Sequence, residues 1–207
     1  MSRMSYRVEH CAIVVLAAGM SSRLGNPKQL LIYHGKSLLK HTVDAALQTP
    51  MRPVVVVVGA NSDAVKKEIK KMEIVIEENK GWQEGMASSL RCGLEAVQKK
   101  SDDVDGIIFM VCDQPYVTQS LLDSLLLAQH ETGLPIVASS YEDKLGTPAL
   151  FHKCFFAELM KLKGDTGARK LIKQHKEQVT TVAFPKGIID IDTRTDYEVL
   201  LNEKMIT

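Results

Sequence analysis

The sequence has little net charge, few aromatic residues and no long hydrophobic run. Its 207 residues carry a formal net charge of +1, and this excludes a general nucleic-acid binder, which would carry a basic excess. The apolar runs at 54–58 and 107–111 have the length of a strand, far short of a bilayer span. The first ten residues lack the apolar core of a signal peptide. We therefore expect no nucleic-acid or membrane partner, and any anion must be bound by a few local groups.

Cysteine is also scarce and scattered. None of the four forms a C-x-x-C pair or a zinc-binding spacing: Cys11, Cys92, Cys112 and Cys154. Free thiols are typical of a reducing compartment, so the sequence favours a cytoplasmic protein.

Strand-like and helix-like segments alternate along most of the chain. Continuous apolar strands between helices are typical of a mostly parallel sheet with helices on both faces, an α/β fold. The expected strands are 11–16, 53–58, 73–77, 107–112 and 135–139, and the expected helices are 37–47, 63–71, 85–97 and 119–129. After residue 140 we expect strands at 147–151, 179–184 and 188–191, with helices at 168–175 and from 195 onward. The length and the absence of a linker or repeat indicate one domain.

The first expected strand runs into a loop suited to phosphate. After Leu16 come three small residues, Ala17, Ala18 and Gly19, which let the backbone approach a ligand closely. Two cations, Arg23 and Lys28, follow them. Exposed N–H groups together with positive charge after a strand favour a polyphosphate. The spacing matches neither a P-loop nor a G-x-G-x-x-G fingerprint, so this is a nucleotide loop of a third kind.

Asp113 ends the apolar run at 107–112, where ligands bind in such sheets. Magnesium prefers one or two carboxylates together with phosphate oxygens and water, so Asp113 is a candidate Mg²⁺ ligand. The alternative role is a cap of the next helix. That helix is expected to begin nearer Thr118, and this favours the metal.

A second pair of carboxylates, Asp190 and Asp192, ends the expected strand at 188–191. Alternation along a strand would place both on one face, so either could complete a metal site with Asp113. We favour Asp192. A competing role is that Asp192 or Thr193 caps the last helix, and the two roles are compatible.

Three further loops carry candidate binding groups. After the third strand, the amides and hydroxyls of Asn79, Gly85 and Ser88 are placed to bind base, ribose or phosphate, while Trp82 is more typical of packing. Later in the chain, Asp165 or Thr166 is expected to cap a helix. Arg169 stands in that helix's first turn, where a cation is unfavourable, so it is either a surface cation or a contact for an anionic acceptor.

Taken together, six motifs in this order resemble the nucleotidyltransferases of the molybdenum cofactor cytidylyltransferase group. The motifs are the loop 16–28, Gly85 to Gly93, Cys112-Asp113-Gln114-Pro115, Gly146-Thr147-Pro148, the segment 164–169, and Asp190-Ile191-Asp192-Thr193. The resemblance spans about residues 12–197. It implies a Rossmann-like α/β fold of the nucleotide-diphospho-sugar transferase type. It further implies a single domain, 1–207, with a nucleotide-binding part at 10–140 and an acceptor-binding part at 141–200.

The resemblance also implies an activity and roles for individual residues. The expected enzyme moves CMP from CTP to the terminal phosphate of molybdopterin or molybdenum cofactor, releases pyrophosphate and requires Mg²⁺. The catalytic residues would be Lys28, Arg23 and Asp113, with Asp113 and Asp192 holding the metal. The nucleotide would be bound by Leu16, Ala17, Ala18, Gly19, Arg23, Lys28, Asn79, Gly85, Ser88 and Asp113, and the acceptor by Gly146, Pro148 and Arg169. Two alanines at 17–18 favour CTP, because the guanylyl branch carries glycine there.

Other activities remain open at this point. One is GMP transfer from GTP to the same cofactor, and another is nucleotidyl transfer to a sugar or polyol phosphate. A third is a non-catalytic carrier that delivers the cofactor to a client enzyme such as a molybdenum hydroxylase. A carrier needs neither a triphosphate clamp nor a metal, so the presence of Arg23, Lys28, Asp113 and Asp192 favours an enzyme.

Overall fold

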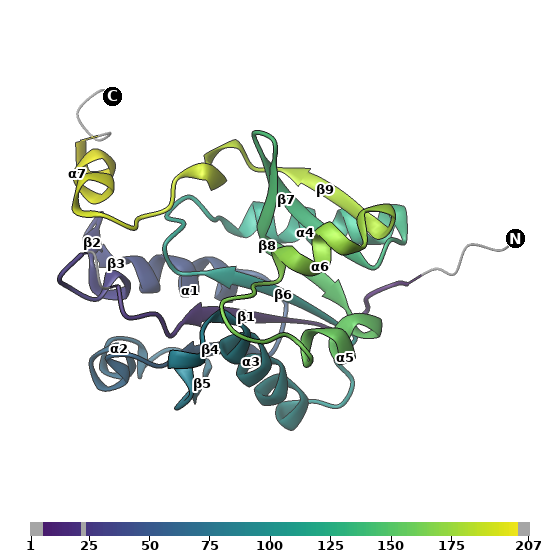
Figure 1. The fold of residues 1–207 in the computed structure, drawn as a ribbon, viewed down its shortest axis with the longest axis horizontal. Helices are drawn as coiled ribbons and strands as arrows, with labels where there is room; N and C mark the ends of the chain where they lie inside the picture. Colours follow the sequence, from purple (N-terminus) through teal and green to yellow (C-terminus); the bar gives the residue numbers. More distant parts are fainter. Residues whose placement is uncertain (1–5, 22–23, 203–207) are drawn as a thin grey trace, which may run out of the picture.

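The computed structural model describes residues 6–21 and 24–202. Seven strands form one sheet in the order β5-β4-β1-β6-β8-β7-β9 (Figure 1). Their bounds are β1 (Cys11–Ala17), β4 (Val54–Val58), β5 (Val75–Glu78), β6 (Gly106–Val111), β7 (Ile136–Tyr141), β8 (Lys144–His152) and β9 (Val179–Ala183). Only β8 runs antiparallel to its neighbours in this sheet, and β7 and β9 pair parallel. The sheet is therefore mostly parallel, as the apolar strands predicted.

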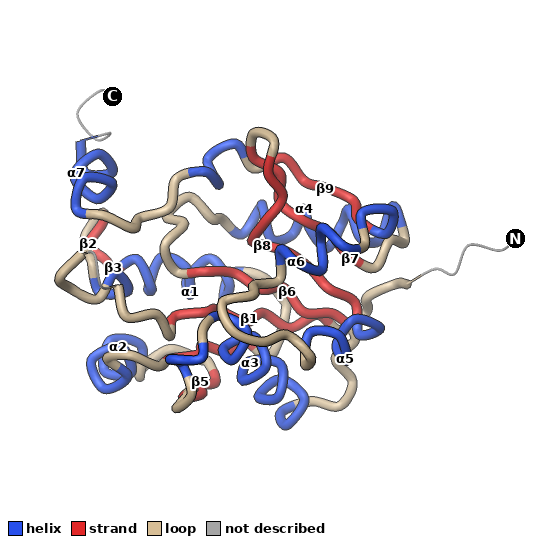
Figure 2. The backbone as a smooth tube through the Cα atoms, viewed as in Figure 1, coloured by secondary structure: helices blue, strands red, loops and turns tan. Residues whose placement is uncertain are grey.

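Helices cover both faces of the sheet (Figure 2). Their bounds are α1 (Leu38–Gln48), α2 (Ser62–Ile69), α3 (Met86–Lys100), α4 (Gln119–Thr132), α5 (Phe156–Leu159), α6 (Arg169–Gln174) and α7 (Arg194–Asn202). Ile13 and Val15 of β1 pack in a core with α1, α2 and α4, whereas Ala12 and Val14 pack with α3, α5 and α6. This two-sided burial confirms the Rossmann-like α/β expectation. Within the described ranges, no helix combines the length and apolarity that crossing a membrane requires.

Close packing of α3 on β1 depends on one glycine. A Cβ added at Gly93 would lie 2.4 Å from Cγ1 of Val14, so only glycine lets the helix approach this closely. The neighbouring parallel strands also end together, since Ala17 pairs with Val58 and Leu16 with Val111. The loops that follow β1, β4 and β6 therefore meet at one edge of the sheet.

The expected strand at 188–191 is wrong. A 3₁₀ turn, Pro185–Ile188, occupies its start, and the backbone then crosses the ends of the strands. The N–H of Ile191 donates to the carbonyl of Asp113 (3.1 Å), and Nε2 of Gln114 donates to the carbonyl of Gly187 (2.9 Å). Hydrogen bonds to the loop after β6 thus replace those of a sheet ladder. The sequence also did not reveal the two-stranded hairpin β2 (Ile32–Tyr33) and β3 (Lys36–Ser37), or the short α5.

Candidate active site

Two pockets open at the carboxyl edge of the sheet and share a wall. The β1 pocket, of about 350 Å³, is lined by the end of β1, the loop after it, and residues before and at the start of α3: Leu16, Ala17, Ala18, Gly19, Met20, Trp82, Gly85, Met86 and Ser89. The β8 pocket, of about 410 Å³, is lined by Gly146, Thr147, Arg169, Asp190 and Asp192. Both pockets are also lined by Lys28 and Asp113. Groups bound in the two pockets would therefore meet at these two side chains.

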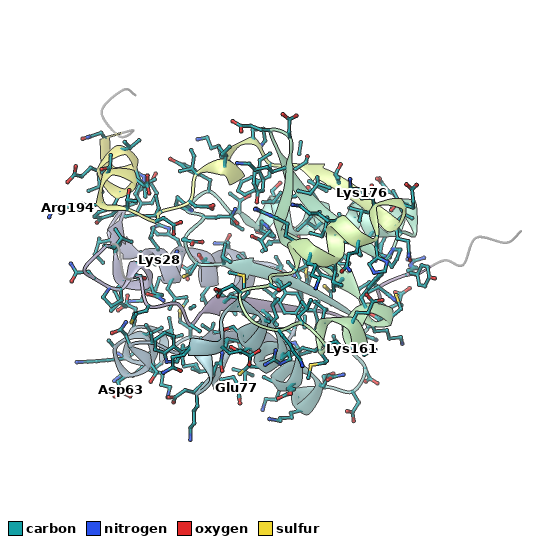
Figure 3. The ribbon with its side chains drawn as sticks, in the orientation of Figure 1. Lys28, Asp63, Glu77, Lys161, Lys176 and Arg194 are labelled. Carbon is teal, nitrogen blue, oxygen red and sulfur yellow. The ribbon has the colours of Figure 1, made fainter. Side chains whose placement is uncertain are left out.

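The Lys28 ammonium lies between two carboxylates. Its Nζ contacts Oδ2 of Asp113 and, at 2.9 Å, Oδ1 of Asp192 (Figure 3 labels Lys28). The side chains of Lys28 and Asp113 are only 16 % and 15 % exposed, so solvent screens their interaction weakly. Burial lowers the pKa of Lys28, but the charges of Asp113 and Asp192 outweigh it and raise the pKa above its usual value. The lysine therefore stays charged, and its contact with phosphate stays a prediction.

Gln29 organises the loop that faces the β1 pocket. This fully buried side chain donates from Nε2 to the carbonyls of Ala17 (2.9 Å) and Gly19 (2.8 Å). The carbonyl of Ala18 accepts a bond from the N–H of Ala60 (3.0 Å). In a trans peptide the N–H points in the direction opposite to the carbonyl that precedes it. The three N–H groups that follow the carbonyls of Ala17, Ala18 and Gly19 therefore point away from the donors on Gln29 and Ala60. Sequence reasoning missed Gln29, because its bonds reach carbonyls 10 and 12 residues away and leave no local pattern.

Asp113 does not cap a helix. The N-terminus of α4 is capped by Thr118, whose side chain accepts a bond from the N–H of Leu121 (3.3 Å). This leaves the Asp113 carboxylate in the cleft, and its role as a metal ligand stays a prediction. Its Oδ1 is buried and has no hydrogen-bond partner among the described residues. An unpaired buried carboxylate oxygen is costly, so it marks a position where a ligand would be favourable.

Asp192 is likewise released from capping. The N-terminus of α7 is closed by Thr193 and Asp196, each accepting a bond from the other's backbone N–H (3.2 and 2.7 Å). Asp190 lies in the β8 pocket without a direct contact to Lys28. Partial burial, followed by the nearby charges of Asp113 and Asp192, raises the pKa of Asp190 to about 6. Because the segment is not a strand, the expected common face of the two carboxylates is replaced by a common cleft.

The oxygen atoms present fit a divalent cation of the magnesium type. Magnesium takes one or two carboxylates and completes its shell with phosphate and water oxygens. Asp113 offers the unpartnered Oδ1, and Asp192 reaches the same ammonium from the segment before α7. In the described part of the chain, no group of three or more His, Cys, Asp or Glu side chains is arranged to hold a metal. A metal here would therefore depend on oxygens supplied by the substrate.

Asn79 supports the β1 pocket from behind. Its Nδ2 donates to the hydroxyls of Ser88 (2.7 Å) and Ser89 (3.0 Å), and its Oδ1 accepts from the N–H of Gly81 (2.9 Å). Ser89, rather than Ser88, lines the pocket. Nucleotide contact by Asn79 and Ser88 stays a prediction, and their visible role is to join the end of β5 to the start of α3.

The expected cap by Asp165 or Thr166 is wrong, because the residue before α6 is Ala168 and no side chain that the structure describes caps that helix. Asp165 instead packs against Gly85 and lines both pockets. A Cβ at Gly85, whose φ is +113°, would lie 2.3 Å from Oδ1 of Asp165. Gly85 is therefore needed both for its backbone conformation and for this close approach.

Arg169 is held at the far wall of the β8 pocket. Its Nη2 donates to the Tyr141 hydroxyl (2.9 Å), and a Cβ at Gly146 would lie 2.1 Å from that hydroxyl. Pro148 is buried behind this wall, where its carbonyl accepts a bond from the Ser139 hydroxyl (2.7 Å). Acceptor contact by Gly146, Pro148 and Arg169 stays a prediction. Arg23, expected to contact phosphate, lies outside the described residues.

A mostly parallel sheet whose strand ends hold two joined pockets, with a lysine between two carboxylates at the junction, defines a nucleotidyltransferase-like α/β domain. Comparison with protein families agrees, since the profile described as "MobA-like NTP transferase domain" matches residues 13–179. The chain belongs to this nucleotidyltransferase family.

Individual relatives carry different names. A nicotine blue oxidoreductase of Paenarthrobacter nicotinovorans is 31 % identical over 78 % of this chain and 80 % of its own length. A molybdenum cofactor guanylyltransferase of Shewanella putrefaciens is 24 % identical over 89 % of this chain and 92 % of its own. Among solved structures, Rv0371c of Mycobacterium tuberculosis is 32 % identical, with a TM-score of 0.81 over 93 % of this chain and 98 % of its own. A second structure of Rv0371c, in complex with manganese, is 29 % identical with a TM-score of 0.77 and covers the same shares.

Proposed function

We propose that this enzyme transfers CMP from CTP to the terminal phosphate of molybdopterin or molybdenum cofactor, with Mg²⁺ as its metal. The observation that carries the proposal is the Lys28 ammonium between Asp113 and Asp192, where the two pockets meet. A triphosphate in the β1 pocket and an acceptor phosphate in the β8 pocket would converge there. The relative named a molybdenum cofactor guanylyltransferase supports the acceptor, and the manganese complex of Rv0371c supports a divalent metal.

The chemistry is a displacement at phosphorus. An acceptor phosphate oxygen forms a bond to the α-phosphorus of CTP, the bond from that phosphorus to the bridging oxygen breaks, and pyrophosphate leaves with the electron pair. The acceptor phosphate is already ionised, so the step needs positioning and charge neutralisation rather than a general base. Lys28 supplies a permanent cation beside the transferring group, and the loop after β1 presents N–H groups to the triphosphate. Mg²⁺ held by Asp113 and Asp192 would neutralise charge that develops on the phosphate oxygens.

The identity of the nucleotide base is the most specific part of the proposal. Ala17 and Ala18 favour CTP through the family resemblance, whereas the guanylyltransferase relative makes GTP the second candidate. A pyrophosphate-release assay with molybdopterin, MgCl₂ and each of CTP, GTP, ATP and UTP separates them. We expect the largest kcat/KM with CTP. Faster release with GTP would replace CMP transfer by GMP transfer, and release from no nucleotide would favour the non-catalytic carrier.

The proposal also divides the chain between the two substrates. Residues 10–140 would bind the nucleotide and residues 141–200 the acceptor, because β8 and α6 supply much of the β8 pocket. We place the reaction in the cytoplasm, where the four free thiols remain reduced. A molybdenum hydroxylase is the client expected to receive the product.

A further inference from the structure

The cleft does not end at Arg169. A further cavity of about 810 Å³, here called the distal pocket, is lined by α6, the start of β8 and the edge strand β9. Figure 1 labels these three elements. Its lining comprises Asp143, Lys144, Leu145, Arg169, Ile172, Lys173, Lys176, Val179 and Thr181. Arg169 and Ile172 line the β8 pocket as well. The distal pocket is therefore a continuation of the β8 pocket, on the side away from Lys28.

The sign of the charge reverses along this path. The β8 pocket is lined by four carboxylates and two cations, whereas the distal pocket is lined by four cations and one carboxylate. None of Lys144, Lys173 and Lys176 forms an ion pair with a residue that the structure describes (Figure 3 labels Lys176). The whole chain carries a net charge of only +1, so this concentration of positive charge is local. Clefts lined by one sign of charge attract ligands of the opposite sign.

Arg169 stands at the boundary between the two pockets and is fixed there. Its bond to the Tyr141 hydroxyl and the close approach allowed by Gly146 hold the guanidinium against β8. Beyond it, Leu145, Ile172 and Val179 add apolar surface among the lysines. Such a lining suits a flat or apolar ligand that also carries a negatively charged group.

We infer that the acceptor carries a second anionic group, separate from the phosphate that is attacked, and that Lys144, Lys173 and Lys176 bind it. The inference rests on the proposed function and specifies its acceptor as a molecule with two separate anionic groups. The carboxylates around Lys28 repel an anion that has no metal with it, while the distal lysines attract one. The charge reversal thus orients the acceptor with its reacting phosphate toward Asp113 and its second anionic group toward α6.

The test compares two triple variants with equal loss of charge. In the first, Lys144, Lys173 and Lys176 are replaced by alanine. In the control, Lys67, Lys70 and Lys71, at the end of α2, are replaced by alanine. With molybdopterin as acceptor, we expect the first variant to raise the KM for the acceptor at least tenfold and to flatten its dependence on salt. Its kcat and its KM for the nucleotide should stay within twofold, and the control should match the wild type.

An unchanged acceptor KM in the first variant, or an equal change in the control, would overturn the inference while leaving the transferase proposal intact. The inference would also be overturned if the first variant lost only its inhibition by inorganic phosphate and kept its acceptor KM, since the lysines would then bind a free anion rather than the acceptor. Isothermal titration calorimetry of molybdopterin binding, in the absence of nucleotide, tests the distal site separately from the proposed transferase activity. If no wild-type turnover is found, binding that the first variant loses still supports the distal site, and binding by neither protein refutes it.

Discussion

The ammonium of Lys28 contacts the carboxylate of Asp113, a residue 85 positions further along the chain. One belongs to the loop after β1 and the other follows β6, and these strands are hydrogen-bonded neighbours in parallel register. The contact therefore joins two loops that emerge at the same edge of the sheet. It also places the cation that would hold a triphosphate beside the carboxylate that would hold a metal. The predictions below test this arrangement and the groups that support it.

Replacing Asp113 by asparagine should abolish most of the activity while preserving the fold. The variant loses a fixed charge beside the transferring phosphate, which typically removes about 3 kcal/mol of transition-state stabilisation, roughly a hundredfold in rate. Pyrophosphate release measures the rate, and circular dichroism measures the fold. Asp102→Asn, in the turn before β6 at the opposite end of that strand, is the control and should keep full activity. Near-normal turnover of Asp113→Asn would refute the metal assignment.

Lys28→Met should make the protein less stable and more responsive to Mg²⁺. Without the ammonium, the little-exposed Asp113 carboxylate faces Asp192 unpaired, which should cost about 2 kcal/mol of folding free energy. A divalent cation can then take the place of the ammonium between the two carboxylates. We expect millimolar MgCl₂ to raise the melting temperature of the variant by more than that of the wild type, measured by thermal shift. An equal rise in both proteins would contradict a shared cation site.

Gln29→Met should weaken nucleotide binding in particular. Methionine keeps the volume but removes both donors to the loop carbonyls of Ala17 and Gly19. The loop N–H groups then lose their fixed direction, and we expect the KM for the nucleotide to rise about tenfold, a loss of about 1.4 kcal/mol. The KM for the acceptor should change little, a separation that a purely structural defect would not produce. Gln98→Met, on the exposed face of α3, should leave both values unchanged.

Asp190→Asn should stabilise the protein at neutral pH but not in acid. The folded-state pKa of Asp190, about 6, lies above the ordinary aspartate value of 3.8, so the unfolded chain releases this proton first as pH rises. The free energy of unfolding of the wild type therefore falls as the pH rises from about 4 to about 6, and the asparagine variant avoids this loss. We expect a gain of about 1 kcal/mol at pH 7.5, reduced from the full shift by solvent screening at this partly exposed position. Urea unfolding across pH 3.5–8 measures it, and a gain that persists at pH 3.5 would contradict the prediction.

Two nearby glycines should respond differently to alanine. Gly85→Ala forces a side chain into a positive-φ conformation and toward the backbone N of Asp165, which would lie 2.7 Å from the new Cβ. We expect a loss of about 2 kcal/mol or more in unfolding free energy, because neither strain can be relieved by a side-chain rotation. At Gly81 the nearest atom would be 3.5 Å away, an ordinary contact, so Gly81→Ala should cost less than about 1 kcal/mol. Similar losses in the two variants would show that the close approach of the 164–168 loop is unimportant.

Part of the candidate site could be predicted from local pattern alone. An apolar run that ends at Asp113, and another that ends in small residues before Lys28, place both side chains at the carboxyl edge of a parallel sheet. The same reasoning could not find Gln29, whose role depends on carbonyls 10 and 12 residues away. Nor could it find the Tyr141–Arg169 bond, which joins β7 to α6.

The sequence by itself determined the alternation of strands and helices, because a continuous apolar run can be buried on both faces only inside a covered sheet. It also determined which loops carry charge. Only the tertiary structure decided how those charges are paired and which backbone crosses the strand ends. The segment at 188–191 has the composition of a strand, yet its N–H at Ile191 is bound by the carbonyl of Asp113. Such bonds join residues far apart in the chain, and their free energy depends on geometry that no local pattern records.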